Sequence, residues 1–265
     1  MVGNNSAGTH SIVHGTTRDH TLEIRMILSD GSVGEFAAQS SESFAEKCRL
    51  ESFEGDLYRQ VKELLDKQEN QASIDAEFPD QGVVRRNTGY ALDELLNSTE
   101  FKGEGAKYDN FNFCRLLAGS EGTLGFMTEI KLHLDPLPPP HKALVPVHVN
   151  TVMEAIRGNL IALKHSPSAV ELMDQKILDL TEDNISQRKN RFFVKGHPGA
   201  ILIVEFVADS MEDIEEVISA MRKDFEAEGL GYHFPIVTGA DIPRVWNLRK
   251  AGLGVLGNMK GDAKP

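Results

Sequence analysis

Three glycines at three-residue spacing form the segment of this sequence with the clearest capacity for chemistry. Gly119, Gly122 and Gly125 lie between an apolar stretch and a run, Phe126 to Leu134, that alternates apolar and polar residues. The apolar spacing before the glycines predicts a helix, and the alternation after them predicts a strand. Glycine permits positive φ and lets another molecule approach backbone N–H groups, because it has no Cβ. The segment therefore suits either a tight helix-to-strand turn or the binding of a flavin or pyrophosphate.

The N-terminal segment offers a second set of polar groups. Residues 1–20 are rich in glycine, asparagine, serine and threonine, which is the composition of a loop. Asn4, Asn5 and Ser6 can make local turns through side-chain bonds to the backbone. The same side chains can instead contact a ligand.

Together the two segments resemble the FAD-linked 2-hydroxy-acid dehydrogenases, a family that includes D-lactate, glycolate and D-2-hydroxyglutarate dehydrogenases. Gly119-Ser-Glu-Gly-Thr-Leu-Gly-Phe-Met-Thr-Glu129 is similar to the closing segment of the family's PCMH-type FAD-binding domain. Gly3-Asn-Asn-Ser-Ala-Gly8 and His14-Gly-Thr-Thr-Arg-Asp19 are similar to its flavin loop and the turn that follows. The resemblance covers nearly the whole chain and implies FAD as cofactor. The cofactor contacts that it implies are Gly3, Asn4, Asn5, Ala7, Gly8, His14, Gly15, Thr17, Glu121, Gly122, Thr123, Gly125 and Phe126.

Near the end of the chain, Val245-Trp-Asn-Leu-Arg-Lys250 resembles the family's Trp-x-x-Arg helix. The resemblance implies that Arg249 anchors the substrate carboxylate at the flavin face. A 2-hydroxy acid is an anion, and a guanidinium can both bind it at two points and orient its C2–H bond. Lys264 corresponds to a second basic catalytic residue of the family, and a solvated lysine is the alternative.

Two further sets of charged residues are candidates for binding or catalysis. Arg85 and Arg86 can face a carboxylate or phosphate, or they can be a solvated pair in a loop; a similar phrase in the family keeps Arg86 as a candidate. Glu171 and Asp174 can act as paired carboxylates in acid–base catalysis. Because they lie three residues apart at the end of a predicted strand, capping of the next helix is favoured.

The first half of the chain is predicted to form a β-hairpin followed by helices. Residues 22–28 and 33–37 alternate around a Ser-Asp-Gly turn, which predicts two antiparallel strands. Residues 40–70 have helical spacing and predict two surface helices. In the polar region 68–105 only residues 90–96 are predicted to be helical.

A proline-rich segment, Asp135-Pro-Leu-Pro-Pro-Pro140, ends the third predicted strand and marks a domain boundary. The elements expected after it are strand 142–149, helix 152–164, strand 168–173, helix 175–180, strand 200–208, helix 211–228 and strand 232–238. Capping boxes begin both long helices, and the apolar stripe of the helix at 211–228 is expected to face the core. Strand–helix–strand repeated twice predicts a ferredoxin-like arrangement, which also resembles the family's cap domain.

The expected fold class is therefore α+β, with two domains. Residues 1–135 are expected to form the second part of a PCMH-type FAD-binding domain. Residues 136–265 are expected to form an incomplete substrate domain of the FAD-linked oxidase C-terminal type, a ferredoxin-like α/β cap.

The composition of the chain argues against several classes of function. The chain has 28 basic and 40 acidic residues and a net charge of -12, which argues against binding to nucleic acid. Its two cysteines, Cys48 and Cys114, cannot alone form an iron–sulfur or cysteine-rich zinc site, and no metal site is predicted. No run of 18 apolar residues and no signal-peptide pattern is present, so we expect a cytoplasmic protein, at most peripheral to the inner membrane.

The resemblance implies an interior fragment of an FAD-dependent oxidoreductase that transfers a hydride from a small D-2-hydroxy acid to flavin. In relatives, the glycine loop for the FAD pyrophosphate lies before the region that matches Met1, and an active-site histidine follows the region that matches Pro265. We therefore expect this chain alone to be inactive. Its expected partners are the substrate, a separate FAD-binding subdomain and an iron–sulfur region. The alternative is a non-catalytic scaffold or assembly piece that needs a separate flavin-binding subdomain.

Overall fold

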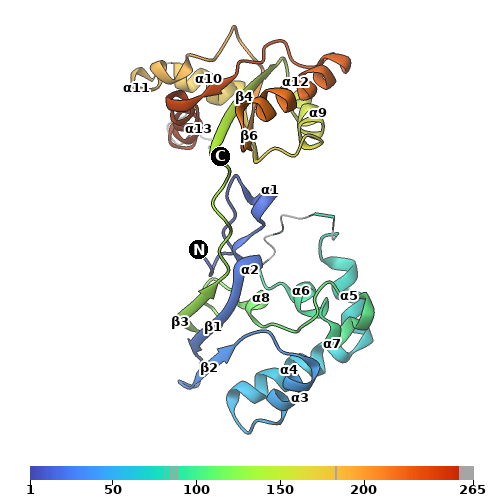
Figure 1. The fold of residues 1–265 in the computed structure, drawn as a ribbon. Helices are drawn as coiled ribbons and strands as arrows, with labels where there is room; N and C mark the ends of the chain where they lie inside the picture. The colour runs from blue at the N-terminus through green and yellow to red at the C-terminus, as the bar shows by residue number, and fades with distance from the viewer. Residues whose placement is uncertain (81, 84–85, 87–88, 183, 257–265) are drawn as a thin grey trace. The chain divides into compact units, whose positions relative to one another are not determined.

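The structure is a computed structural model that describes residues 1–80, 82–83, 86, 89–182 and 184–256 (Figure 1). The chain divides into two compact units, Met1–Asp135 and Pro136–Pro265. Each unit combines helices with its own antiparallel sheet, so the expected α+β class is confirmed. Among the described residues, no helix has both the length and the apolar character that a membrane span requires.

The sheet of the first unit has three antiparallel strands in the order β2–β1–β3. The strands are β1 (Thr21–Ile27), β2 (Val33–Phe36) and β3 (Phe126–Leu132). Ile24 of β1 lies opposite Phe36 of β2 on one side and opposite Ile130 of β3 on the other. The predicted hairpin and the predicted strand after the glycines are both confirmed.

The helices of the first unit are α1 (Ser11–His14), α2 (Thr17–His20), α3 (Ser41–Arg49), α4 (Phe53–Asp66), α5 (Gln68–Glu77), α6 (Leu92–Leu96), α7 (Thr99–Lys102) and α8 (Cys114–Leu117), with a 3-10 turn η1 (Gly103–Gly105). The two helices predicted within residues 40–70 are confirmed as α3 and α4. The prediction of a single helix in 68–105 is wrong, because α5 and α7 lie there. Helix α5 buries only Ile74, so its sequence carries no apolar stripe. The helix predicted before the glycines is a single turn, because Phe111 instead forms an isolated bridge with Gln39.

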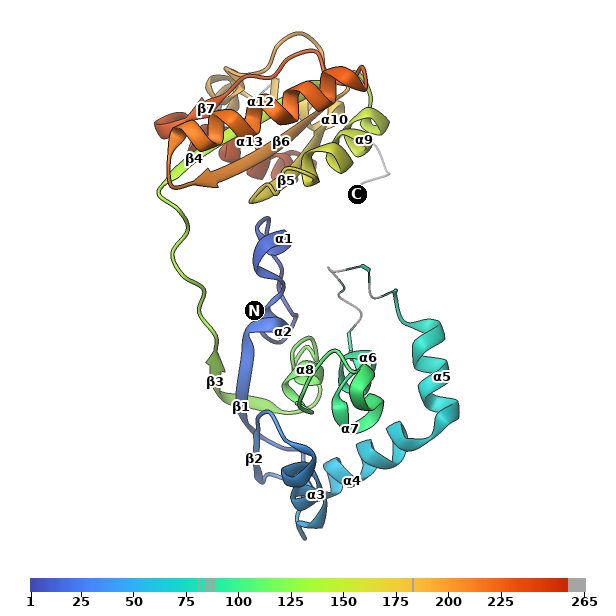
Figure 2. The same ribbon diagram turned by 45° about the vertical axis from the view of Figure 1, so that its right-hand side comes forward.

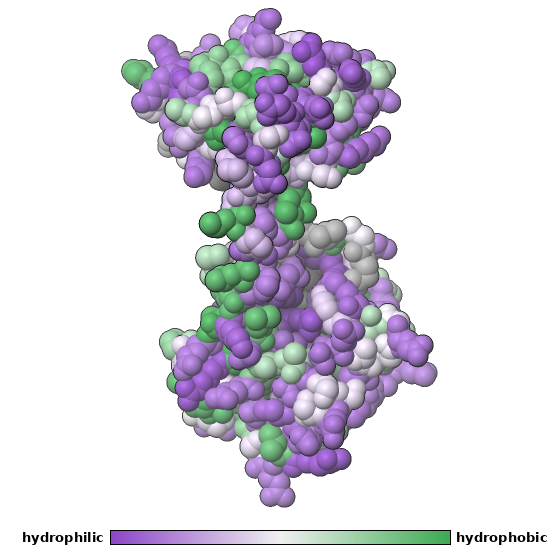
Figure 3. Space-filling view, viewed as in Figure 1, coloured by the Kyte–Doolittle hydropathy of each residue, from purple (hydrophilic) through white to green (hydrophobic). Residues whose placement is uncertain are grey.

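An aromatic core covers one face of this sheet. Phe44, Tyr58, Phe111 and Phe113 are buried and pack edge to face or tilted against one another, with Phe36 of the sheet beside them. Strand β3 lies outside this cover. Three of its apolar side chains stay on the surface, with Phe126, Ile130 and Leu132 exposed by 71%, 41% and 43%, while Met127 packs against the core (Figure 3).

The second unit contains a four-stranded antiparallel sheet in the order β5–β6–β4–β7. The elements are β4 (His141–Val149), α9 (Val152–Leu163), β5 (Ala169–Asp174), β6 (Ala200–Ala208), α12 (Met211–Ala227) and β7 (Val237–Thr238). This connection and strand order form the predicted ferredoxin-like arrangement. Strand β7 is shorter than the predicted strand 232–238, because His233 makes only an isolated bridge with His148 and Pro235 has no N–H to donate.

Helices cover both faces of this sheet (Figure 2). On one face α9 and α12 pack through the stripe Ile214, Ile218, Met221 and Phe225, so the predicted core face of the helix is confirmed. The other face is covered by α10 (Gln175–Glu182) and α13 (Ile242–Leu256). The short elements α11 (Ile185–Arg188), η2 (Lys189–Arg191) and η3 (Gly239–Asp241) complete the unit.

Each long helix has the N-cap bond of its predicted capping box, but not the return bond to the N-cap backbone among the described residues: Glu154 accepts from the N–H of Asn150 at 2.9 Å, and Asp213 accepts from the hydroxyl of Ser210 at 2.6 Å. The side chain of Thr151 accepts a hydrogen bond from the N–H of Glu154 at 3.1 Å, and Ser210 accepts one from the N–H of Asp213 at 3.1 Å. Such caps satisfy backbone donors that a helix leaves unpaired at its first turn. They explain why the sequence located the starts of α9 and α12 correctly.

A buried histidine joins β4 to the loop before β6. His148 is fully buried; its Nδ1 lies 2.9 Å from the carbonyl oxygen of Pro146, and its Nε2 accepts a hydrogen bond from the N–H of Lys195 at 3.2 Å. These two bonds fit the neutral imidazole, which has one donor and one acceptor. Burial lowers the pKa of His148 to about 4.

We predict that His148 makes the protein less stable as the pH falls from 6.5 to about 4. In that interval the unfolded chain binds a proton at this position and the native chain does not. The free energy of unfolding therefore decreases as the pH is lowered. The shift corresponds to a loss on the order of 2 to 3 kcal/mol. Urea unfolding at several pH values should give a shallower dependence for His148→Gln. The exposed His197→Gln is the control and should keep the wild-type slope; an unchanged slope for His148→Gln would contradict the assignment.

Candidate functional site

The structure brings together the two segments that the sequence analysis linked to flavin. We call them the N-terminal loop, Met1–Gly8, and the glycine loop, Ala118–Gly125. The N–H of Gly119 donates to the carbonyl oxygen of Val2 at 3.0 Å, and the N–H of Glu121 donates to that of Gly3 at 2.7 Å. The two loops are therefore held side by side by direct backbone bonds.

Gly125 and Gly122 of the glycine loop differ in what surrounds them. A Cβ on Gly125 would lie 2.3 Å from Cε of Met26 and 2.7 Å from the carbonyl oxygen of Ile27, so this position is required for packing against β1. Gly122 has φ +75°, and no atom lies within 4 Å of the position that its Cβ would take. No hydrogen bond is made by its N–H among the described residues. Gly122 is thus the open point of the loop, with a backbone donor available there.

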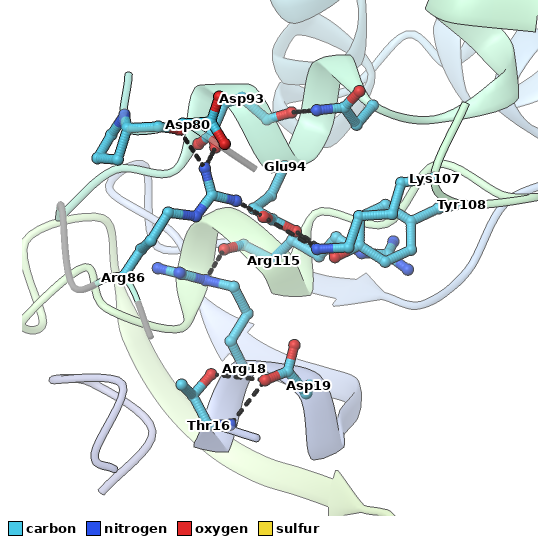
Figure 4. A network of polar contacts seen from close by, with 12 residues as sticks. Thr16, Arg18, Asp19, Asp80, Arg86, Asp93, Glu94, Lys107, Tyr108 and Arg115 are labelled. Atoms are coloured by element: carbon cyan, nitrogen blue, oxygen red, sulfur yellow. Dashed lines mark hydrogen bonds and ion pairs between the residues drawn. The ribbon is translucent and has the colours of Figure 1, made fainter. Parts of the chain in front are cut away.

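Arg18 bonds to both loops, and Figure 4 shows its side chain extending toward Arg115. Its side chain is almost fully buried, and its Nε donates to the carbonyl oxygen of Arg115 at 2.7 Å. Its Nη2 donates to the carbonyl oxygens of Ala118 at 2.8 Å and Gly89 at 3.3 Å. The backbone N–H of Arg18 also donates to Oδ1 of Asn5 at 2.7 Å. Burial lowers the pKa of Arg18, and the nearby carboxylates oppose that shift.

A buried ion network lies next to Arg18 (Figure 4). The side chain of Arg86 is 8% exposed and pairs with Asp93 at 2.5 Å and with Glu94. Glu94 also lies 3.2 Å from Nζ of Lys107 and accepts a hydrogen bond from the hydroxyl of Tyr108. The interpretation of Arg86 as a solvated residue is therefore wrong: it faces two carboxylates of the protein itself. Contact of Arg86 with a ligand stays a prediction. Arg85 lies outside the described residues.

Several of the predicted cofactor contacts use their side chains within the N-terminal region. Oδ1 of Asn4 accepts from the hydroxyl of Ser6, and the hydroxyl of Thr17 donates to the carbonyl oxygen of Ser6 at 2.7 Å. His14 places Nδ1 2.7 Å from Oδ2 of Asp135. Gly15 has φ +73°, a conformation that favours glycine in this local turn.

The remaining predicted contacts lie on the two loops or where β3 begins. Ala7 and Gly8 belong to the N-terminal loop, Glu121 is exposed with φ +53°, and the hydroxyl of Thr123 bonds to that of Tyr90 at 2.5 Å. Phe126 is the most exposed large residue of β3. Contact of any of these residues with FAD stays a prediction.

One residue of the glycine loop was not singled out from the sequence. Ser120 is 2% exposed, and its buried hydroxyl oxygen has no hydrogen-bond partner in the described part of the chain. A buried polar atom without a partner is costly and marks a place where a ligand or water completes the structure. Its position between Gly119 and Glu121 was the only available signal in the sequence.

In the second unit, Arg249 lies on α13, over the sheet face that α13 covers. Its Nη2 donates to Oε2 of Glu171 on β5 at 2.8 Å, while its Nε is buried and has no hydrogen-bond partner among the described residues. Asp174 caps α10 as predicted, accepting from the N–H of Ile177 at 2.9 Å. The capping role predicted for Glu171 is wrong, because this carboxylate binds Arg249. Lys264 lies outside the described residues.

A second ion pair occupies the same sheet face. Glu205 is fully buried, and its Oε1 lies 3.3 Å from Nζ of Lys142 and accepts from the hydroxyl of Ser168 at 2.8 Å. The sheet register places Glu205 opposite Ala169 and Glu171 opposite Ile203. Neither Lys142 nor Glu205 was identified from the sequence, because both lie within otherwise apolar strands. Across the described residues, no set of three or more His, Cys, Asp or Glu side chains is arranged to hold a metal ion.

Comparison with known proteins adds independent findings. Residues 138–265 match the family described as FAD linked oxidases, C-terminal domain. Over its full length the chain is 29% identical to the D-2-hydroxyglutarate dehydrogenases of Pseudomonas putida and Escherichia coli, and it spans 26% of the length of each. It is also 38% identical to the glycolate oxidase subunit GlcD of Bacillus subtilis over 74 residues, which cover 28% of this chain and 16% of that protein.

We predict that Arg18→Met destabilises the first unit by roughly 3 kcal/mol. The substitution keeps the length of the side chain but leaves three carbonyl oxygens without their buried donors. Urea unfolding followed by circular dichroism would measure the loss. The control is Arg25→Met, which removes an arginine of the same unit that pairs with Glu129 on the exposed sheet surface and should change stability little. Equal effects of the two substitutions would contradict the role given to Arg18.

Proposed function

Because residues 138–265 belong to the C-terminal domain family of FAD linked oxidases, and the whole chain is similar to D-2-hydroxyglutarate dehydrogenases, we propose that it forms part of an FAD-dependent oxidoreductase. The proposed reaction is the oxidation of a small D-2-hydroxy acid of the lactate, glycolate or 2-hydroxyglutarate class. In this proposal the first unit is the second part of the FAD-binding domain, and the second unit is the substrate domain. The chain spans about a quarter of the length of these relatives, so other sequence would supply the rest of the site.

The observation that carries the proposal is the backbone pairing of the N-terminal and glycine loops. The two loops match the family's flavin-binding segments in sequence, and they lie in direct contact in the structure. The residues present fit FAD, since Gly122 offers an open N–H donor and the Ser120 hydroxyl is a buried polar group without a partner among the described residues. Polar groups of this kind suit the heteroatoms of a flavin ring.

The chain's own residues would bind and orient. The N-terminal and glycine loops would hold the flavin, and the guanidinium of Arg249 would bind the carboxylate of the substrate. A guanidinium that grips a carboxylate at two points fixes the position of the neighbouring C2–H bond. When bound, FAD supplies the acceptor for the hydride.

A chimera tests the proposal. The quarter of the Escherichia coli D-2-hydroxyglutarate dehydrogenase that matches this chain is replaced by residues 1–265, and the purified protein is examined for flavin absorbance. We expect a yellow protein whose flavin is bleached anaerobically by at least one D-2-hydroxy acid and not by its L enantiomer. A folded chimera without flavin would contradict the cofactor, and flavin that no 2-hydroxy acid bleaches would contradict the reaction.

A non-catalytic assembly role is the second candidate, favoured by the exposed apolar side chains of β3. An apolar strand on a surface is a common site of contact with another polypeptide. The two candidates differ in the chimera, because an assembly piece would restore folding and solubility without substrate-dependent bleaching.

We predict that Gly122→Val abolishes flavin retention in the chimera and leaves the second unit folded. The valine side chain would occupy the open space in front of the loop, where the flavin is proposed to approach. Flavin content per polypeptide is the measurement. The control is Gly103→Val, a surface glycine with φ +58° and open space around it, which imposes a similar backbone strain away from the loop. A Gly122→Val protein that keeps its flavin would show that the loop is only a turn.

We predict that Arg249→Lys lowers kcat/KM for the hydroxy acid while flavin content stays normal. Lysine keeps the positive charge but loses the planar two-point grip on the carboxylate. The loss should be roughly 2 to 4 kcal/mol in kcat/KM. Steady-state kinetics with several D-2-hydroxy acids would measure it. Unchanged kinetics would refute the anchor role, and loss of flavin would mean that Arg249 supports the cofactor or the fold.

A further inference from the structure

We infer that Glu171 is a positioning residue that fixes the guanidinium of Arg249 for carboxylate binding; this inference rests on the proposed function of Arg249. The two side chains come from different elements of the second unit, β5 and α13. Oε2 of Glu171 accepts a hydrogen bond from Nη2 of Arg249 at 2.8 Å. The side chains are 18% and 27% exposed, so the bond is shielded from water but can be reached from the surface.

The backbone of Arg249 is already held in place without Glu171. Val245 and Leu248, one turn earlier and one residue earlier on α13, are fully buried in the core cluster that includes Leu144 and Ile203. These contacts fix the helix on the sheet. They do not fix the end of a long side chain with several rotatable bonds, which loses about 2 kcal/mol of conformational freedom when it is ordered.

Glu171 is the polar contact that orders this side chain. Among the described residues, the guanidinium makes no other hydrogen bond, and its buried Nε has none. A guanidinium carries five N–H donors. The bond to Glu171 holds Nη2 at one point and leaves several donors for an incoming carboxylate.

The charges on this face support a specific pairing. Glu205, a second carboxylate on this face, lies 3.3 Å from Nζ of Lys142. The register separates Glu171 from Glu205 by one strand and two residues, so each glutamate meets a different basic side chain. Glu171 is thus paired with Arg249 rather than shared among several cations.

Positioning and simple neutralisation predict opposite results. If Glu171 only neutralised Arg249, its removal would strengthen the binding of an anion, because a competing negative charge is lost. If Glu171 orients the guanidinium, its removal would weaken binding, because ordering the Arg249 side chain would then cost free energy when the anion binds. Glutamine separates charge from geometry, since its side-chain oxygen can still accept the bond from Nη2.

Calorimetric titration of the full chain with D-lactate and with D-2-hydroxyglutarate tests the inference. We expect Glu171→Ala to raise Kd roughly five- to tenfold, and Glu171→Gln to stay within about twofold of wild type. The matched control is Glu228→Ala, which removes a glutamate paired with Arg157 on the opposite face of the sheet and should leave Kd unchanged. A Glu171→Ala chain that binds either acid as tightly as wild type, or more tightly, overturns the inference.

A second readout does not depend on substrate binding. In the 15N-labelled chain, the Nε–H signal of Arg249 is assigned by its loss in Arg249→Lys. We expect this signal to persist in Glu171→Gln and to broaden or exchange faster with water in Glu171→Ala; an unchanged signal in Glu171→Ala overturns the inference. If the wild-type chain bound neither acid but the signal changed as expected, the anchor role of Arg249 would fail while the positioning contact would stand.

Discussion

The first unit depends on one buried arginine. The Arg18 side chain donates hydrogen bonds to three carbonyl oxygens in two separate segments, one at Gly89 and the other at Arg115 and Ala118. Among the described residues no carboxylate bonds directly to Arg18; such an arginine is costly to bury, and neighbouring charges offset part of that cost. The acidic side chains of Asp93 and Glu94 lie close enough to do so. Without this side chain the two loops would keep their backbone bonds to each other, but the glycine loop would lose the hydrogen bond that Arg18 donates to Ala118.

Local signals in the sequence were enough for most of the second unit. The caps at Thr151 and Ser210, the apolar stripe of α12 and the alternation of the strands each act within a few residues, and each was visible without the structure. Strand β7 is an exception. Its sequence predicts a longer strand, but Pro235 has no N–H to donate to a neighbouring strand. The order of the strands followed from the chain order of the elements.

The site was less predictable, because its contacts join residues far apart in the sequence. Arg18 was noticed only as part of a Thr-Thr-Arg-Asp phrase, and nothing near it in the chain indicates that its partners lie at Gly89 and Ala118. The spacing of Glu171 and Asp174 along the chain favours capping of the next helix, whereas in the structure Glu171 bonds to Arg249 on another element. For Arg86 the sequence leaves two interpretations open, a solvated residue or one that faces an anionic group, and the structure pairs it with the buried carboxylates of Asp93 and Glu94.

The two units also carry their proposed functional groups in different ways. The loops of the first unit depend on backbone conformation, with positive φ at Asn5, Gly119, Glu121 and Gly122, and few of their bonds require a particular side chain. Such a surface can survive extensive substitution elsewhere, which is compatible with 29% identity to full-length relatives. The proposed group in the second unit depends instead on two side chains, Arg249 and Glu171, which are hydrogen-bonded to each other. The proposed carboxylate site of the second unit is therefore more sensitive to a single side-chain substitution than the proposed flavin-binding loops are.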